Sequence, residues 1–362
     1  MSRDLKAYTE RPVEPTGDRF GSHRGIEPPG SLPQAAVRVD NDFTRLFAGE
    51  LLLTVETLNV DAASFRQMEE ADAAGAAGVA KRVLDTVSTR GKQHNPVTGS
   101  GGMLLGRVLQ VAPGHPDHGR LKRGDRVASL VSLSLTPLRL SQVTATRAES
   151  AQLDVEGEAV LFANGAYALL PDDLSERLAL AALDVAGAAP QITRLVKPGA
   201  RVLVLGAGGK SGLLACYAAR RAGGPSAVVV GVETHAPYAE DLRKLGVCNT
   251  VLEADARDSL AIRTLALEAG GGVEYDLSIS CVNVEASEMA AILPLRDRGI
   301  AYFFAMSTSF SRAALGAEGV GKDVDLMIGN GYAQGHADAT LALLREEQAL
   351  KALFETRYGG SA

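Results

Sequence analysis

One stretch near the middle of the chain constrains the fold more than any other. A short apolar run, Val202 to Leu205, ends in glycines and passes directly into an Ala- and Leu-rich helical pattern that continues to Ala215. A strand, a glycine-rich turn and a helix in this order are typical of the first unit of a dinucleotide-binding fold. The free N–H groups and the dipole of the helix start would attract a pyrophosphate, which the glycines allow to approach closely. The stretch therefore predicts a dinucleotide site.

The spacing of the glycines leaves two registers open. A G-x-G pattern begins at Gly206, but its third glycine, Gly212, comes one position late. We favour the register that starts at Ala207, because Gly209 and Gly212 then take the close-approach and helix-packing positions. The predicted cofactor loop consists of Gly206, Ala207, Gly208, Gly209, Lys210, Ser211 and Gly212.

A second apolar run, 227–232, is followed by Glu233, Thr234 and His235. An acid about 20 residues past the glycine loop bonds the ribose hydroxyls and repels a 2′-phosphate, so Glu233 favours NAD. Thr234, His235 and Lys210 could accept an additional phosphate, which leaves NADP possible. Cys281 ends a further predicted strand, where this fold borders the nicotinamide, and we expect it to be a small packing residue rather than a nucleophile.

Length, net charge and cysteine content argue against several classes of protein. The 362 residues are enough for two domains with sizeable cores, and the net charge of −6 argues against a nucleic-acid or anionic-membrane partner. The polar first twenty residues do not resemble a secretory signal. The three cysteines have no metal-binding or disulfide spacing, which fits a reducing compartment. We therefore expect a cytoplasmic protein.

The order of the predicted elements indicates two architectures in succession. Residues 49–60 predict a strand, residues 62–91 helix, and residues 100–165 several short strands of a compact antiparallel lobe or barrel. From Pro171 onward, strand-like and helical runs alternate as in a parallel sheet. The last segment, from about residue 316, lies outside this rhythm and is expected to pack back on the first lobe. It includes a predicted helix over residues 338–358.

Residues 121–127 and 170–199, together with the glycine loop, resemble the medium-chain dehydrogenase/reductase superfamily. The resemblance implies an α/β fold with a GroES-like β-barrel-type catalytic lobe (1–173), a Rossmann doubly wound parallel sheet (174–310) and a return to the catalytic lobe (311–362). It also implies a homodimer or homotetramer.

The zinc ligands of this superfamily are missing from the sequence. Asn59 stands near the position of a cysteine ligand, and Gly101-Gly102-Met103 stands where zinc enzymes carry Gly-His-Glu. Because zinc requires His, Cys or carboxylate ligands, we expect no catalytic zinc.

A narrower resemblance is carried by the stretches 21–28, 30–34, 56–65 and 91–103. These resemble the L-erythro-3,5-diaminohexanoate dehydrogenase family of lysine degradation. The resemblance implies NAD-dependent oxidation of the C3 amine of (3S,5S)-3,5-diaminohexanoate to (S)-5-amino-3-oxohexanoate and ammonia. Two alternatives stay open: another zinc-free reductase acting on quinones or enoyl substrates, and a non-catalytic NAD(P)H-binding sensor.

The candidate catalytic residues lie in or beside these stretches. Arg24 could bind the substrate carboxylate through two parallel hydrogen bonds, and Asp61 or Glu56 could hold the distal ammonium. His23 and His94 are acid/base candidates near neutral pH, while related zinc-free reductases often carry Asn at the position of Asn59. For each residue the alternative is a structural role, as a local partner or a solvated side chain.

Overall fold

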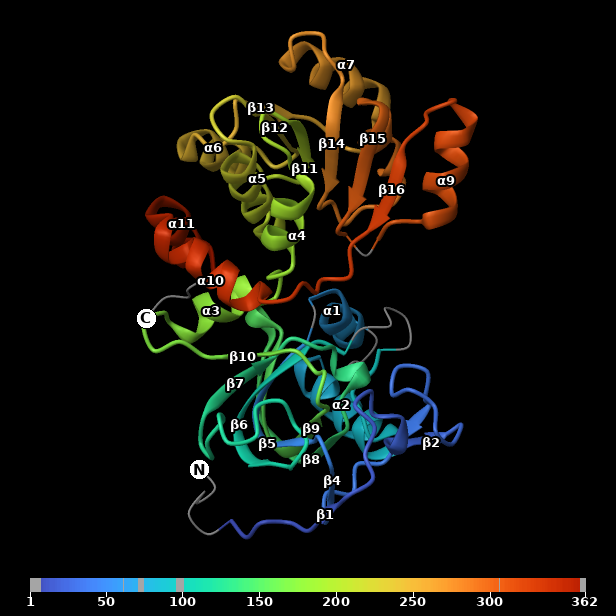
Figure 1. Ribbon diagram of the computed structural model, residues 1–362, viewed down its shortest axis with the longest axis vertical. Coiled ribbons are helices and arrows are strands. Elements are labelled where there is room, and N and C mark those ends of the chain that lie inside the picture. Colours follow the sequence, from blue (N-terminus) through green and yellow to red (C-terminus); the bar gives the residue numbers. More distant parts are fainter. Residues whose placement is uncertain (1–7, 61, 71–74, 96–100, 306, 359–362) are drawn as a thin grey trace. The chain divides into compact units, whose positions relative to one another are not determined.

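The structure is a computed structural model that describes residues 8–60, 62–70, 75–95, 101–305 and 307–358; the side chains of residues 62, 63, 76 and 149 are also left out of the description. The chain divides into two compact units, Met1–Pro171 and Asp172–Ala362 (Figure 1). Each unit is described by itself. No helix among the described residues is long and apolar enough to cross a membrane.

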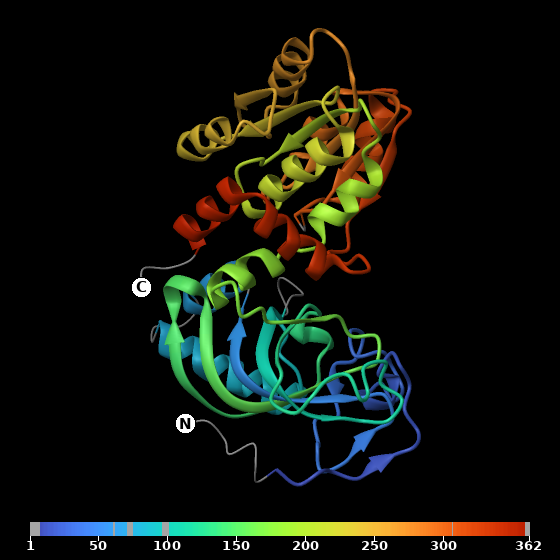
Figure 2. The same cartoon turned by 60° about the vertical axis from the view of Figure 1, so that its left-hand side comes forward.

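The first unit is built on a six-stranded antiparallel sheet with the order β10-β7-β6-β5-β9-β8, and its strong curvature is visible in Figure 2. Its strands are β5 (Leu51–Asn59), β6 (Met103–Val111), β7 (Arg126–Ser129), β8 (Leu138–Arg147), β9 (Gln152–Leu161) and β10 (Tyr167–Leu169). The central strand β5 is buried over most of its length, although Thr54, Glu56, Thr57 and Asn59 interrupt its apolar sequence. The sheet confirms the predicted antiparallel lobe.

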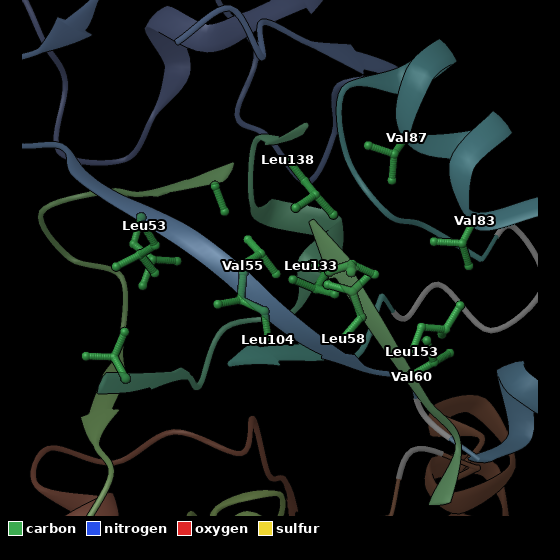
Figure 3. Packing of buried hydrophobic residues seen from close by; sticks show 14 of the residues in the cluster. Leu53, Val55, Leu58, Val60, Val83, Val87, Leu104, Leu133, Leu138 and Leu153 are labelled. Atoms are coloured by element: carbon green, nitrogen blue, oxygen red, sulfur yellow. The ribbon is translucent and has the colours of Figure 1, made fainter. Parts of the chain in front are cut away.

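Two helices, α1 (Ala62–Glu70) and α2 (Ala76–Arg90), follow β5. Val83 and Val87 of α2 are buried in the same apolar cluster as Leu58 of β5 and Leu153 of β9 (Figure 3). Gly91 ends α2 in the left-handed conformation, with φ at 72°, and donates its N–H to the carbonyl of Val87. The helix α2 therefore ends at Gly91, directly before residues 92–95.

The N-terminal segment contains two small sheets. β1 (Val13–Glu14) pairs in parallel with β4 (Leu46–Phe47), and β2 (Gly25–Glu27) pairs antiparallel with β3 (Arg38–Val39). Short 3₁₀ turns lie at Ser22–Arg24, Leu133–Leu135 and Ala148–Ser150.

The second unit contains a six-stranded parallel sheet with the order β13-β12-β11-β14-β15-β16. Its strands are β11 (Arg201–Leu205), β12 (Val228–Glu233), β13 (Thr250–Glu253), β14 (Tyr275–Ser280), β15 (Leu295–Phe303) and β16 (Asp325–Ile328). The chain runs outward from β11 to β13 and returns on the other side of β11 with β14. Ligands bind open parallel sheets at such a switch point, outside the carboxyl ends of the strands.

Helices cover both faces of this sheet. The helices of this unit are α3 (Glu176–Leu183), α4 (Ala188–Leu195), α5 (Lys210–Gly223), α6 (Ala236–Leu245), α7 (Ser259–Ala269), α8 (Glu288–Ile292), α9 (Phe310–Gly319), α10 (His336–Glu346) and α11 (Gln348–Tyr358). Apolar residues of α7, α8 and α9 share a core with one face, while α5 and α6 contact β12 on the other. The arrangement confirms the predicted doubly wound parallel sheet.

The last part of the chain differs from its prediction in two respects. Residues 325–328 continue the sheet as the edge strand β16, rather than lying outside it. The predicted helix 338–358 is interrupted at Glu347 and forms α10 and α11. Both helices contact α3, and the segment 311–362 is grouped with the second unit. The three-part division at 173/174 and 310/311 stays a prediction beside this two-part division.

Candidate functional site

The glycine-rich loop between β11 and α5 makes its tight turn at Gly206, not at Ala207. Gly206 has φ at 70°, which favours glycine, whereas Ala207 is fully buried. A Cβ atom at residue 212 would lie 2.0 Å from the carbonyl oxygen of Gly206, so only glycine allows the helix to pack this closely. Gly209 is the N-cap of α5, and a Cβ there would meet only one neighbouring atom, 3.7 Å away. The register is therefore Gly206-x-x-Gly209-x-x-Gly212, which corrects the first position of the predicted fingerprint.

The Glu233 carboxylate holds the loop in place from the end of β12. One oxygen accepts the N–H of Gly208 at 3.0 Å, and the other accepts the N–H groups of Thr234 and His235 at 2.9 and 3.0 Å. The side chain is buried. A fixed negative charge thus lies at the end of the second strand, directly against the glycine loop.

A cavity of about 300 Å³ opens beside these residues. It is lined by loop and strand-end residues that include Gly206, Gly209, Glu233, Thr234, His235 and Cys281. Concave sites of this size at a topological switch point are typical of cofactor sites. The structure brings most of the predicted cofactor residues together around one hollow.

Two loop residues have other partners. The Lys210 ammonium lies 2.9 Å from the Asp184 carboxylate, and Ser211 is hydrogen-bonded to the Cys281 thiol. Burial raises the pKa of Cys281 to about 12, although the Ser211 hydrogen bond lowers it in part. The thiol is therefore protonated at neutral pH, as expected for a packing residue rather than a nucleophile.

In the first unit, the side chain of Arg24 is not accessible to a ligand. Its side chain is 0 % exposed, and its Nε and Nη2 donate to the two oxygens of Glu50 at 2.7 and 2.8 Å. The carbonyls of Asp42 and Arg45 accept further hydrogen bonds at 2.9 and 3.3 Å. The guanidinium is fully occupied within the fold, which corrects the expectation that Arg24 binds a substrate carboxylate.

His23 belongs to the same buried network. Its Nδ1 accepts the N–H of Asp18 at 3.1 Å, so its Nε2 carries the proton that faces Glu50 at 2.9 Å. The ring packs against Phe47 and Phe162, with ring centres 4.7 and 5.7 Å apart. Both nitrogens are therefore engaged, and the structural role replaces the acid/base role.

Glu50 is the centre of this network, and sequence reasoning missed it. Burial alone would raise the pKa of its carboxyl, but the hydrogen bonds from Arg24 and His23 and the charge of Arg24 outweigh this and lower the pKa. The only sequence indication is an acid directly before an apolar strand. That position is unusual because a buried carboxylate needs a partner.

Glu56 lies on β5, where the strand pairing shifts between Val55 and Thr57. Its two oxygens accept hydrogen bonds from Arg107 at 2.7 Å and from Arg126 at 3.0 Å. These ion pairs on the sheet surface give Glu56 a local partner role. Asp61, the other candidate for the ammonium, lies outside the described residues.

Two of the recognised stretches meet at the end of β5. A Cβ atom at residue 102 would lie 2.2 Å from the carbonyl oxygen of Asn59, and one at residue 101 would lie 2.5 Å from that of Gln93. Asn59 itself accepts a hydrogen bond from Gln152 at 3.2 Å. The glycines thus bring the stretches 56–65 and 91–103 into direct contact, with polar residues on both sides.

His94 stays a candidate base. Its Nδ1 lies 3.2 Å from the Arg90 guanidinium. Burial, and then the charges of Lys92 and Arg90, lower its pKa, so the imidazole is neutral at pH 7 and can accept a proton.

Lys92 is a second residue that sequence reasoning did not single out. Its side chain is buried, and its ammonium donates to the carbonyl of Pro33 at 2.5 Å. Burial, reinforced by Arg90, lowers its pKa to about 8. The contact also joins a third recognised stretch, 30–34, to the segment that follows α2.

Metal ligands do not assemble in the described part of the chain. Among these residues, no three His, Cys, Asp or Glu side chains come together in a way that could hold a metal ion. The absence of catalytic zinc stays a prediction. It rests on the residue types at 58–59 and 101–103, which are not His, Cys or carboxylate ligands.

Comparison with solved structures agrees with the fold. A mycobacterial quinone oxidoreductase is similar with a TM-score of 0.52 at 20 % identity, over 84 % of this chain and 82 % of that one. The CurK enoyl reductase gives a TM-score of 0.52 at 15 % identity, over 84 % and 81 %. At these identities the likeness concerns architecture alone.

Comparison of sequences is more specific. Residues 23–171 match the family model of the L-erythro-3,5-diaminohexanoate dehydrogenase N-terminal domain. Proteins named L-erythro-3,5-diaminohexanoate dehydrogenase from Acetoanaerobium sticklandii and Fusobacterium nucleatum are 49 % and 46 % identical to this chain, over 94 % of it and 99 % of each relative. The chain belongs to the L-erythro-3,5-diaminohexanoate dehydrogenase family.

Proposed function

We propose that this chain catalyses the oxidative deamination of (3S,5S)-3,5-diaminohexanoate with a nicotinamide cofactor, yielding (S)-5-amino-3-oxohexanoate and ammonia. The observation that carries the proposal is the identity of 49 % and 46 % to two enzymes of that name over nearly their full length. The reaction would belong to lysine degradation.

The second unit fits a dinucleotide. Gly209 leaves open space at the start of α5, and the cavity beside it reaches the strand-end residue Cys281. The first N–H groups of α5 would bind the pyrophosphate, because helix starts leave such donors free. A bound nicotinamide would supply the hydride acceptor for the C3 hydrogen, which requires an approach of roughly 3–3.5 Å.

The remaining steps need proton transfers by the protein. The amine must be neutral when the hydride leaves, and water must then be deprotonated as it adds to the substrate iminium. His94 suits a base role, because its lowered pKa keeps the imidazole neutral at pH 7. We assign it this role, with Asn59 as a hydrogen-bonding side chain at the end of β5.

We propose NAD as the preferred cofactor. Glu233 is buried and negatively charged at the end of β12, where a 2′-phosphate would meet repulsion. The only arginine that lines the cavity, among the described residues, is Arg257, and its guanidinium is paired with Asp255. Equal or better kcat/KM with NADP would overturn this preference.

The decisive experiment is a coupled assay of the purified protein. NADH formation and ammonia release should be equimolar and should depend on diaminohexanoate. The variant H94Q should lose activity by about 100-fold, within the range that general-base catalysis contributes, and should bind NADH normally. NADPH-dependent reduction of quinones or enoyl substrates without amine oxidation would favour a reductase, and NADH binding without any turnover would favour a sensor.

Location and assembly are also part of the proposal. We propose a cytoplasmic homodimer or homotetramer that acts on a small amino-acid substrate. All three cysteines are free thiols, which suits a reducing compartment, and the net charge of −6 does not favour nucleic acid. Light scattering of the purified protein would give the subunit number, and a monomeric active species would contradict this part.

A further inference from the structure

The last turn of α11 reaches the glycine-rich loop through Arg357. The Nη1 of this arginine donates to the carbonyl oxygen of Gly208 at 2.6 Å. Its Nη2 donates to the Asp241 carboxylate at 2.7 Å, and its guanidinium carbon lies 3.8 Å from the ring centre of Tyr238. The Arg357 side chain is 8 % exposed. A charged group this deeply buried requires partners, and one of them is the cofactor loop itself.

Gly208 is consequently held from both sides. Its N–H donates to Glu233, and its carbonyl accepts from Arg357. Because the peptide bond is planar, fixing the carbonyl of Gly208 also fixes the orientation of the N–H of Gly209, the N-cap of α5. The position of Arg357 therefore influences the orientation of the N–H groups in the first turn of α5.

Arg357 is itself well anchored. Tyr238 and Asp241 both belong to α6, which α11 contacts. Phe354, one turn earlier on α11, is fully buried, and the neighbouring Tyr358 ring lies 5.4 Å from the Lys210 ammonium. The end of α11 thus contacts two residues of the loop, Gly208 and Lys210.

We propose that Arg357 is a positioning residue for the dinucleotide cofactor. It acts through the Gly208 carbonyl, and it makes the C-terminal helix α11 a structural part of the cofactor site. The inference rests on the proposed function only in taking a nicotinamide dinucleotide as the ligand of this loop.

The test compares R357M with the matched variant R345M in the full-length protein. Methionine keeps much of the apolar stem and removes the guanidinium, while Arg345 on α10 pairs with Asp173 and has no described contact with the loop. We expect R357M to raise the dissociation constant of NADH and the KM for NAD by about 10-fold, with the KM for the amine unchanged. R345M should leave all three at the wild-type values, and R357K should recover part of the affinity.

A double-mutant cycle addresses the mechanism. E233Q and R357M act on the N–H and the carbonyl of the same residue, so their effects on NADH affinity should be less than additive. Wild-type NADH affinity in R357M, with or without a lower melting temperature, would overturn the proposal, as would an equal loss of amine and cofactor affinity. NADH binding by the wild-type protein without turnover of diaminohexanoate would refute the proposed substrate alone, since the binding test does not require turnover.

Discussion

The buried pair of Arg24 and Glu50 permits a sharp test between two roles for the same arginine. The sequence suggests that Arg24 binds a substrate carboxylate, whereas the structure places its guanidinium 2.7 and 2.8 Å from the oxygens of Glu50, with both side chains at most 1 % exposed. The perturbations are R24M and E50Q, each of which removes one charge of the pair.

The expected cost follows from the burial. Removing one partner of a buried ion pair costs about 3–5 kcal/mol, because the other charge stays buried without compensation. This is a large part of the ~5–15 kcal/mol that stabilises a typical protein. At roughly 2–4 °C per kcal/mol for a domain of this size, each variant should melt on the order of 10 °C below the wild type.

The assay combines thermal unfolding with amine kinetics at a temperature well below the lowered melting point. The double variant R24M/E50Q should be destabilised by less than the sum of the single variants, because it leaves no unpaired charge. The KM for the amine should stay at the wild-type value in R24M. A wild-type melting temperature together with an amine KM raised at least ~10-fold, a cost of about 1.4 kcal/mol, would refute the structural role and restore Arg24 as a substrate anchor.

Three further predictions concern the loop, acid stability and metal content. G212A should weaken NADH binding by at least ~10-fold, about 1.4 kcal/mol, because its Cβ would lie 2.0 Å from the carbonyl oxygen of Gly206; unchanged affinity in a titration would contradict the packing argument. The pKa values of Glu50 and Glu158 are lowered in the folded state, since hydrogen bonds from arginines outweigh the opposing effect of burial. Their contribution to stability is therefore complete above the unfolded-state pKa near 4.5 and is lost as the pH falls through the folded-state values; urea unfolding at stepwise lower pH should show this loss in the wild type and less of it in E50Q. Elemental analysis after extensive dialysis should find no zinc in the active protein, and about one zinc per active chain would refute the reading of residues 58–59 and 101–103.

Local patterns were sufficient for most of the fold. The strands at 202–205 and 228–232 could be predicted because burial on both sides of a parallel strand favours a nearly continuous apolar run. The edge strand β16 could not be predicted in the same way. Its four residues are exposed or half-buried, so the sequence 325–328 carries neither a long apolar run nor a clear alternation.

In the candidate site, too, the features set by local sequence could be predicted, and those set by distant residues could not. The glycine loop was predictable because a positive φ at Gly206 and the close approach at Gly212 are demands that a local sequence must meet. The ion pair of Arg24 with Glu50 could not be predicted, because the two residues are 26 positions apart and nothing in either local sequence indicates the pairing. Glu56 likewise finds its partner Arg126 70 residues later in the chain.

Gly208 shows why a recognised motif is only part of a binding site. Its N–H is held by a residue 25 positions away and its carbonyl by one 149 positions away, so β12 and the helix α11 both contribute to the geometry of the loop. The glycines permit the required backbone conformation, but they do not select it, because glycine has the widest choice of conformations of any residue. Glu233 and Arg357 contribute to this selection, together with the backbone hydrogen bonds that Gly206 and Ala207 donate to the carbonyl of Val232. A change at either residue should therefore alter cofactor affinity while leaving every residue of the glycine motif intact.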